Sequence, residues 1–212
     1  MNDFIYPYGY QNYCISMNEV NLIKRMNLVW EQHIMWTRML LISIAENLKD
    51  FSATEARLLQ NPRDIANVFE RFYGKNVANV IEKLITEHLA IGEKLIFALK
   101  NKEQKAAADL NAKWYKNADE IAEAFSNFNP FYKRSDVQAM MYEHLRLTSN
   151  EVEERLAGNY VADIKAFDEV QKRSFRHGSI LCRRNSVSIF KFILKDIWGR
   201  VTFVLYIIVD DK

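Results

Sequence analysis

Residues that break helices are rare in this chain, and their rarity constrains its fold more than any other feature. Only six glycines and three prolines occur among its 212 residues. A fold of strands and tight turns needs many such residues, whereas long helices exclude them from their interiors. The sequence therefore predicts long, uninterrupted helices, and its hydrophobic content of 49% with 26% charged residues is typical of a folded protein.

The hydrophobic pattern predicts where these helices lie. Apolar residues recur at steps of three and four residues, which is the period of a buried helical stripe, in four long segments. The segments span roughly residues 17–49, 76–101, 103–128 and 135–157. We expect them to pack against one another, since short connections between long amphipathic helices are typical of a bundle.

Shorter helices are expected in the connection between the first and second long segments. Ser52 and Glu55 have the spacing of a capping box, and Asn61 is predicted to cap a helix that has Pro62 at its first position. Residues 52–60 and 62–73 are thus predicted to be two short helices, and a further helical segment is expected over 160–173. The predicted fold is all-α: an antiparallel up-down four-helix bundle with two short helices in the first crossover and an atypical C-terminal tail.

Three regions of different composition are distinguishable along the chain. Residues 1–16 form an aromatic N-terminal arm, 17–174 the helical bundle and 175–212 the tail. The tail lacks Ala and Glu, and its 7 basic and 3 acidic residues give +4, against −2 from the 22 basic and 24 acidic residues before it. We consider three interpretations of it: an added hairpin, a weak membrane-surface segment, or a non-native extension such as a frameshifted end.

Charge and cysteine content exclude several classes of partner. A net charge of +2 without a concentrated basic face gives no reason to expect nucleic acid. Cys14 and Cys182 lie at opposite ends of the chain, so we expect no disulfide framework and a cytoplasmic location. No secretory signal and no apolar run of about 18 residues occur, so no stable membrane span is expected. The sequence is compatible with either a monomer or a homodimer.

Three of the four histidines occupy matching positions. His33, His88 and His144 each lie on the apolar stripe of a different helix, and they are separated by 55 and 56 residues. At a rise of about 1.5 Å per residue, His88, Asn117 and His144 all lie roughly 20 Å from the turns that connect their helices. His33 is near the middle of the first helix. Four polar side chains are therefore predicted to meet in one layer of the core.

Burial of three imidazoles and an amide is unfavourable unless each finds a partner, and a metal ion can be that partner. We expect one divalent metal (zinc, iron, nickel or manganese), bound by His33, His88 and His144, with Asn117 or Glu120 as a supplementary donor. Glu87 and Glu143 are expected to support the ligands or to be solvated. Hydrolysis, redox chemistry and sensing remain open, and so does whether the protein is an enzyme.

The competing hypothesis is a non-enzymatic helical module with a metal-free polar core layer. In that case the layer is satisfied internally, and the module binds a small ligand or a partner. The same level of the bundle carries side chains that could line a pocket for such a ligand. They are Trp30, Trp36, Thr37, Trp114, Tyr142 and Thr148. Arg38 is expected to pair with an acid or, if buried beside the histidines, with an anionic ligand.

Several segments resemble those of known helical bundles. In a general way the chain is similar to ferritin-like and DinB-like metal-binding bundles, although it lacks the Glu-x-x-His motif of the first and the two histidines on one helix of the second. The segments WEQHIMWTR, TEHLAIG, WYKNADEIA and MYEHLRLTSNE resemble a bacterial four-helix-bundle family without an established activity. The resemblance covers about residues 17–173 and implies a bundle.

Overall fold

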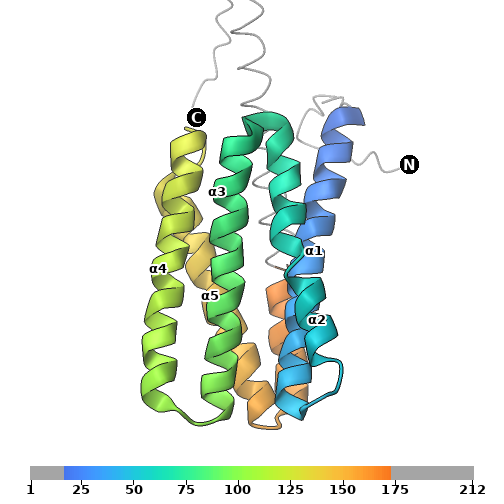
Figure 1. The fold of residues 1–212 in the computed structure, drawn as a ribbon, viewed down its shortest axis with the longest axis vertical. Helices are drawn as coiled ribbons and strands as arrows, with labels where there is room; N and C mark the ends of the chain where they lie inside the picture. Colours follow the sequence, from blue (N-terminus) through green and yellow to red (C-terminus); the bar gives the residue numbers. More distant parts are fainter. Residues whose placement is uncertain (1–16, 173–212) are drawn as a thin grey trace, which may run out of the picture.

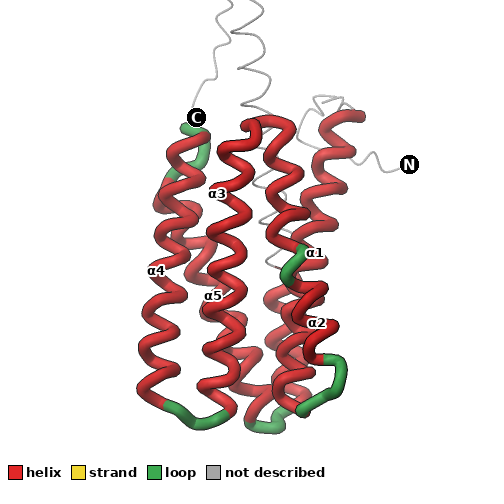
Figure 2. The backbone as a smooth tube through the Cα atoms, viewed as in Figure 1, coloured by secondary structure: helices red, strands yellow, loops and turns green. Residues whose placement is uncertain are grey.

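The computed structural model describes residues 17–172, and this part of the chain is all-helical, without strands (Figure 2). The arm 1–16 and the tail 175–212, with its three interpretations, lie outside the described residues. The helices are α1 (Met17–Glu46), α2 (Phe51–Leu58), α3 (Asn61–Lys100), α4 (Gln104–Phe128) and α5 (Arg134–Leu156). A further helical segment covers 160–172. The predicted all-α class is confirmed.

Gly74 divides α3 into two helical parts. Its φ of 76° and ψ of 174° are not helical, and a positive φ is a conformation that glycine adopts without the steric penalty of a Cβ. Figure 1 shows the chain turning back at this point, so that residues 61–73 and 75–100 lie side by side. The predicted end of the short helix at residue 73 is therefore confirmed.

The long helices share one core. α3 packs against α1 and α4, and α5 packs against α4, α1 and α3, so that these helices lie along one common axis (Figure 1). On α1, three buried apolar residues before His33 belong to one cluster, and three further along the helix belong to a second; they are Leu22, Met26 and Val29, and Leu40, Leu41 and Ile44. His33 thus lies between two apolar clusters of the core.

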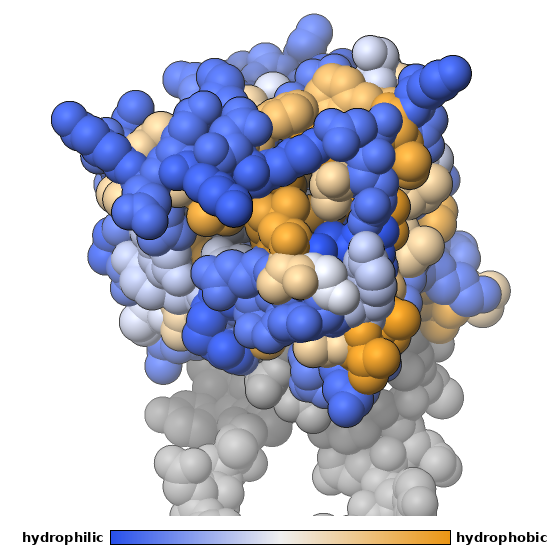
Figure 3. All heavy atoms as spheres, turned by 90° about the horizontal axis from the view of Figure 1, so that it is seen from below, coloured by the Kyte–Doolittle hydropathy of each residue, from blue (hydrophilic) through white to orange (hydrophobic). Residues whose placement is uncertain are grey.

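The surface and the apolar content of the helices agree with this packing. The end of the molecule in Figure 3 is covered mainly by hydrophilic residues, with hydrophobic side chains visible between them. Among residues 17–172, no helix combines the length and the apolar character needed to cross a membrane. The helices instead direct their apolar faces toward one another.

Two local details differ from prediction. The first residue of α3 is Asn61 itself, its N-cap is Gln60, and neither α2 nor α3 has a side-chain capping hydrogen bond. The predicted capping roles of Ser52 and Asn61 were therefore wrong. Asn61 is fully buried, and its amide binds elsewhere, as described below.

Candidate metal centre

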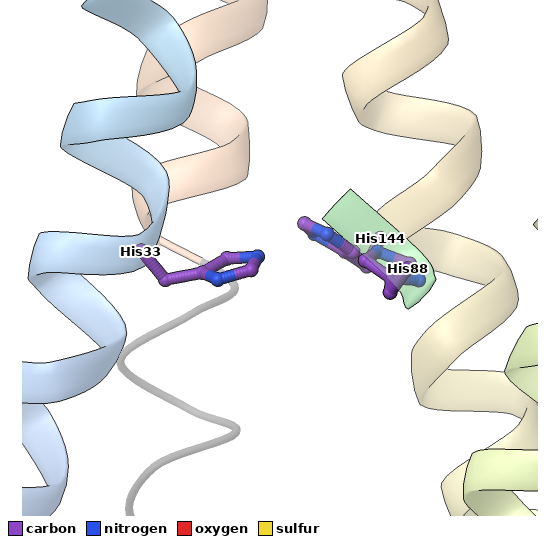
Figure 4. A group of neighbouring side chains, drawn as sticks. All are labelled: His33, His88 and His144. Carbon is purple, nitrogen blue, oxygen red and sulfur yellow. The ribbon is translucent and has the colours of Figure 1, made fainter. Parts of the chain in front are cut away.

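His33, His88 and His144 come together in the core. Figure 4 shows the three imidazoles directed toward one another from α1, α3 and α5. One ligand nitrogen from each histidine lies within 4.8 Å of the other two. Ring centroids are 6.3 Å apart for His33 and His88, and 6.0 Å and 5.8 Å from these to His144. The prediction that three histidines meet at one level is confirmed.

His33 is held by a buried asparagine. The Nδ1 of His33 and the Oδ1 of Asn61 are 2.9 Å apart, and both side chains are buried. The Nδ2 of the same amide donates to the carbonyl oxygen of Val29 at 2.8 Å. Because a carbonyl can only accept, this second bond fixes which end of the amide faces the imidazole. Asn61 must therefore accept, and His33 must donate from Nδ1.

His88 is held in the same way. Its Nδ1 lies 3.0 Å from the Oδ1 of Asn117, whose Nδ2 donates to the carbonyl oxygen of Leu84 at 3.2 Å. Val29 and Leu84 are each four residues before the histidine concerned, so the two arrangements are equivalent. With the proton on Nδ1, the Nε2 of each imidazole carries the lone pair. Such an outer partner is the usual device that orients a metal-binding histidine and selects its tautomer.

The backbone carbonyl groups of His33 and His88 also accept side-chain hydrogen bonds. The Oγ1 of Thr37 donates to the carbonyl oxygen of His33 at 2.7 Å, and the Nε1 of Trp114 donates to that of His88 at 3.0 Å. Gly92, one turn after His88, permits the approach of the indole, because a Cβ there would lie 3.3 Å from Cζ2 of Trp114. The small residues that follow these two histidines thus have distinct roles.

Burial keeps both enclosed histidines neutral. Desolvation lowers the pKa of His33, and the hydrogen bond with Asn61 offsets this only in part. Desolvation, followed by repulsion from His33, lowers the pKa of His88 to about 3. Neutral imidazole is the form that binds metal ions, so no proton has to be removed from these side chains at neutral pH.

Two small cavities adjoin the histidine layer. The first has a volume of about 30 Å³, is lined by all three histidines, and has Thr37, Trp114 and Thr148 in its wall and the half-buried Glu93 beside them. The second, of about 20 Å³, is lined by the same histidines with Trp30 and apolar residues. A water molecule needs roughly 10–15 Å³ of such space. Each cavity therefore has room for one or two waters.

Each cavity has an unsatisfied polar atom in a lining residue. Within the described part of the chain, the Oγ1 of Thr148 and the Nε1 of Trp30 are buried without a hydrogen-bond partner. An unsatisfied buried polar group costs about 1–3 kcal/mol, so a molecule that hydrogen-bonds to it binds more favourably. Four further side-chain atoms of the described residues are also unsatisfied, and these two differ from them in lining a cavity with the three histidines. Both atoms belong to residues next to the histidine layer.

Other residues predicted for the site lie elsewhere. Glu120 is exposed and forms an ion pair with Lys116 at 3.5 Å. Trp36 packs against the second apolar cluster with Arg57 over its ring, and it lines neither cavity. Tyr142 is likewise absent from both walls, and its hydroxyl donates to Asp119 at 2.9 Å. Of the six side chains predicted to line a pocket, four line the cavities.

The acidic neighbours of the histidines are on the surface. Glu87 pairs with Lys83 at 3.8 Å, and Glu143 pairs with Arg146 at 2.9 Å. Both carboxylates point away from the histidine layer into ion pairs on their own helices. Both residues are half-buried, and the expectation that they support the ligands stays a prediction.

Arg38 pairs with acids. Its Nη1 lies 2.6 Å from Glu151 and 2.7 Å from Asp163, which connects α1 to α5 and to the segment 160–172. Burial raises the pKa of Glu151 to about 7, because desolvation outweighs the hydrogen bond from Arg38. Of the two expectations for Arg38, pairing with an acid or with an anionic ligand, the structure shows pairing with acids.

Sequence reasoning missed Asn61 and misassigned Asn117. Both were assigned to other tasks, one to helix capping and the other to direct metal donation. A signal was available in the spacing, because Asn61 follows His33 by 28 residues and Asn117 follows His88 by 29. Two buried histidines with an asparagine at nearly the same distance suggest a repeated contact.

Comparison with known proteins adds no name to this site. No protein-family model matches the chain, and neither a curated protein nor a solved structure matches it. The motif resemblance to a bacterial bundle family therefore remains a resemblance.

Proposed function

We propose that this protein binds one divalent metal ion through His33, His88 and His144. The observation that carries the proposal is the convergence of three ligand nitrogens within 4.8 Å in a mostly buried layer. The bonds from Asn61 and Asn117 support it, because they leave the Nε2 of His33 and His88 available for a metal. Three neutral imidazoles favour zinc, and iron or nickel are alternative occupants. Manganese prefers oxygen ligands and fits less well.

The distances are compatible with one ion after a small closure of the site. Three nitrogens bonded to zinc at about 2.1 Å in tetrahedral geometry lie about 3.4 Å apart. The present limit of 4.8 Å thus requires the nitrogens to move together by no more than about 1.5 Å. His33 and His88 are buried and His144 is half-buried.

The cavity sizes favour an ion over an organic ligand. Pockets for such molecules usually enclose about 300–1,000 Å³. The cavities beside the histidines have about 30 Å³ and 20 Å³. They suit a metal ion with a small attached molecule. The competing module that binds a larger ligand in this core would need a rearrangement of the helices.

The overall arrangement forms part of the same proposal. We infer that α1, residues 75–100, α4 and α5 form an up-down four-helix bundle, in which facing helices supply the ligands. The packing of α3 against α1 and α4, and of α5 against α4, supports this arrangement. We also propose a cytoplasmic location, because the chain has two distant cysteines and no disulfide pattern.

Metal stoichiometry tests the proposal. Full-length protein is dialysed against a chelator, reloaded with zinc and assayed by elemental analysis, beside a variant with His33, His88 and His144 all changed to Ala. We expect one zinc per chain in the wild type and none in the variant, with helicity checked by circular dichroism. The fourth histidine gives the control, since His177→Ala should retain the metal. Zinc retained in the triple variant, or absent from the wild type, contradicts the proposal.

A further inference from the structure

We infer that the bound metal keeps one exchangeable position directed into the larger cavity, and that Thr148 binds the small ligand there. This inference rests on the proposed metal site. The ligand class is water, hydroxide or a small anion of two or three heavy atoms. Thr148 thus has a role in ligand binding in addition to occupying a buried position on α5.

The donor set leaves a position open. Zinc and similar ions take at least four ligands, and three histidines with a water molecule form a well-known type of reactive centre. Among the described residues, the group that can hold a metal consists of three histidines, with no carboxylate or thiolate. Three neutral imidazoles supply no negative charge to the ion, and Glu93, which lines the same cavity, does not belong to the group of ligand atoms. A fourth ligand from outside the chain, preferably an anion, completes the site.

Thr148 differs from comparable threonines in these helices. The hydroxyls of Thr37 and Thr86 both donate to the carbonyl four residues earlier, at 2.7 Å. Thr148 stands in the same relation to His144, but its Oγ1 is buried without a partner among the described residues, although only 5% of the residue is exposed. The hydroxyl is therefore available for a molecule in the cavity that Thr148 and the three histidines line.

The larger cavity is the better place for this ligand. The smaller one is walled by apolar side chains and by Trp30, whose indole N–H can only donate. A threonine hydroxyl can accept a hydrogen bond from bound water and can donate one to hydroxide or another anion. The volume of about 30 Å³ accommodates two or three heavy atoms and excludes a benzene ring.

Azide binding to the cobalt(II) form tests the inference. Cobalt(II) replaces zinc in the full-length chain, and azide is titrated while the visible absorption of the metal is recorded. Four variants are compared with the wild type. Thr148→Val removes the hydroxyl at constant shape and Thr148→Ser retains it. Thr86→Val is the matched control, because its hydroxyl makes the ordinary bond to the carbonyl four residues earlier and lies outside both cavities, and Trp30→Phe probes the smaller cavity.

We expect cobalt to bind to all five proteins and azide to change the spectrum of the wild type. Thr148→Val should weaken azide binding by about tenfold or more, the usual effect of losing a hydrogen bond to a charged group. Thr148→Ser, Thr86→Val and Trp30→Phe should stay within about threefold of the wild type. Benzoate, which is too large for the cavity, should leave the spectrum unchanged.

Three results would overturn the inference while the metal site stands. They are a cobalt spectrum insensitive to azide, equal azide affinity in Thr148→Val and wild type, and weakening by Trp30→Phe in place of Thr148→Val. Failure of cobalt to bind to the wild type would instead overturn the metal site, and the inference with it.

Discussion

The Oδ1 of Asn117 lies 3.0 Å from the Nδ1 of His88, and the same amide donates to the carbonyl oxygen of Leu84. The asparagine is therefore locked between a backbone acceptor and an imidazole donor. Asn61 makes the equivalent pair of bonds at His33. Two ligands of the proposed metal site thus have their tautomer and orientation set before any ion arrives, and this pre-organisation leads to the first prediction.

Replacement of Asn117 by Ala should weaken zinc binding about 10- to 100-fold, which is typical for loss of an outer hydrogen bond to a ligand. Asn117→Asp should lie between Asn117→Ala and the wild type, because a carboxylate still accepts from Nδ1 but cannot donate to the carbonyl oxygen of Leu84. Competition with a chromophoric chelator measures both affinities. Asn111→Ala, an exposed change on the same helix, is the control. Equal affinities for Asn117→Ala and the wild type would contradict the positioning role.

The metal-free protein should lose stability in acid through His88. Its pKa of about 3 in the folded chain lies below the ordinary 6.5, so the unfolded chain binds the proton more readily between these values. Stability from the neutral imidazole is complete above pH 6.5 and is lost as the pH falls toward 3. By pH 5 the loss should be about 2 kcal/mol.

Comparison with His88→Gln isolates this effect. Urea unfolding with a chelator present, at pH 7 and pH 5, should show the variant improving relative to the wild type by that amount at the lower pH. A difference between the two proteins that is the same at both pH values would show that His88 is not held neutral by burial.

The contribution of Glu151 to folding stability should depend on pH in the opposite direction to that of His88. Its pKa is raised to about 7 in the folded chain, so the folded state holds the proton more tightly and stability falls as the pH rises from about 4.5 to 7. Glu151→Gln removes this titration and leaves Arg38 paired with Asp163. Relative to the wild type, the variant should gain up to about 3 kcal/mol between pH 5 and pH 8. Parallel stability curves for the two proteins would contradict the assignment.

Gly92 should resist substitution because of Trp114. In Gly92→Ala the new Cβ lies 3.3 Å from Cζ2 of an indole that is itself bonded to His88. Overpacking of about 1–3 kcal/mol should outweigh the gain of about 1 kcal/mol in helix propensity. In a Trp114→Phe background, which removes the contacting atoms, the same change should become neutral or stabilising. Equal effects in both backgrounds, measured by thermal unfolding, would show that the contact does not matter.

Sequence patterns predicted the helices well because their causes are local. The apolar period and Gly74 determine where α1, α4 and α5 run and where α3 turns back, and the level of each histidine follows from counting residues along straight helices. The convergence of His33, His88 and His144 was accessible for the same reason. The number of residues from the end of a straight helix determines how far along the bundle axis a side chain lies.

The direction of individual side chains was much harder to predict. Asn61 precedes a proline, a pattern that favours helix capping, and only the packing of α3 beside α1 brings it to His33. Glu120 is one turn from Asn117, yet it faces solvent and Lys116. Tyr142 is close to His144 in sequence, but its hydroxyl binds Asp119 on α4. Such contacts depend on how helices are rotated about their axes, which height alone does not determine.

The most direct measurement of the central claim is X-ray absorption spectroscopy of the zinc-loaded, full-length protein. We predict a four-coordinate ion with three imidazole nitrogens at about 2.0–2.1 Å and one further light atom, and multiple-scattering features of three histidine rings. In His144→Ala the count of imidazoles should fall to two. A zinc environment with one imidazole or none, or one unchanged by His144→Ala, would contradict a metal centre built from His33, His88 and His144.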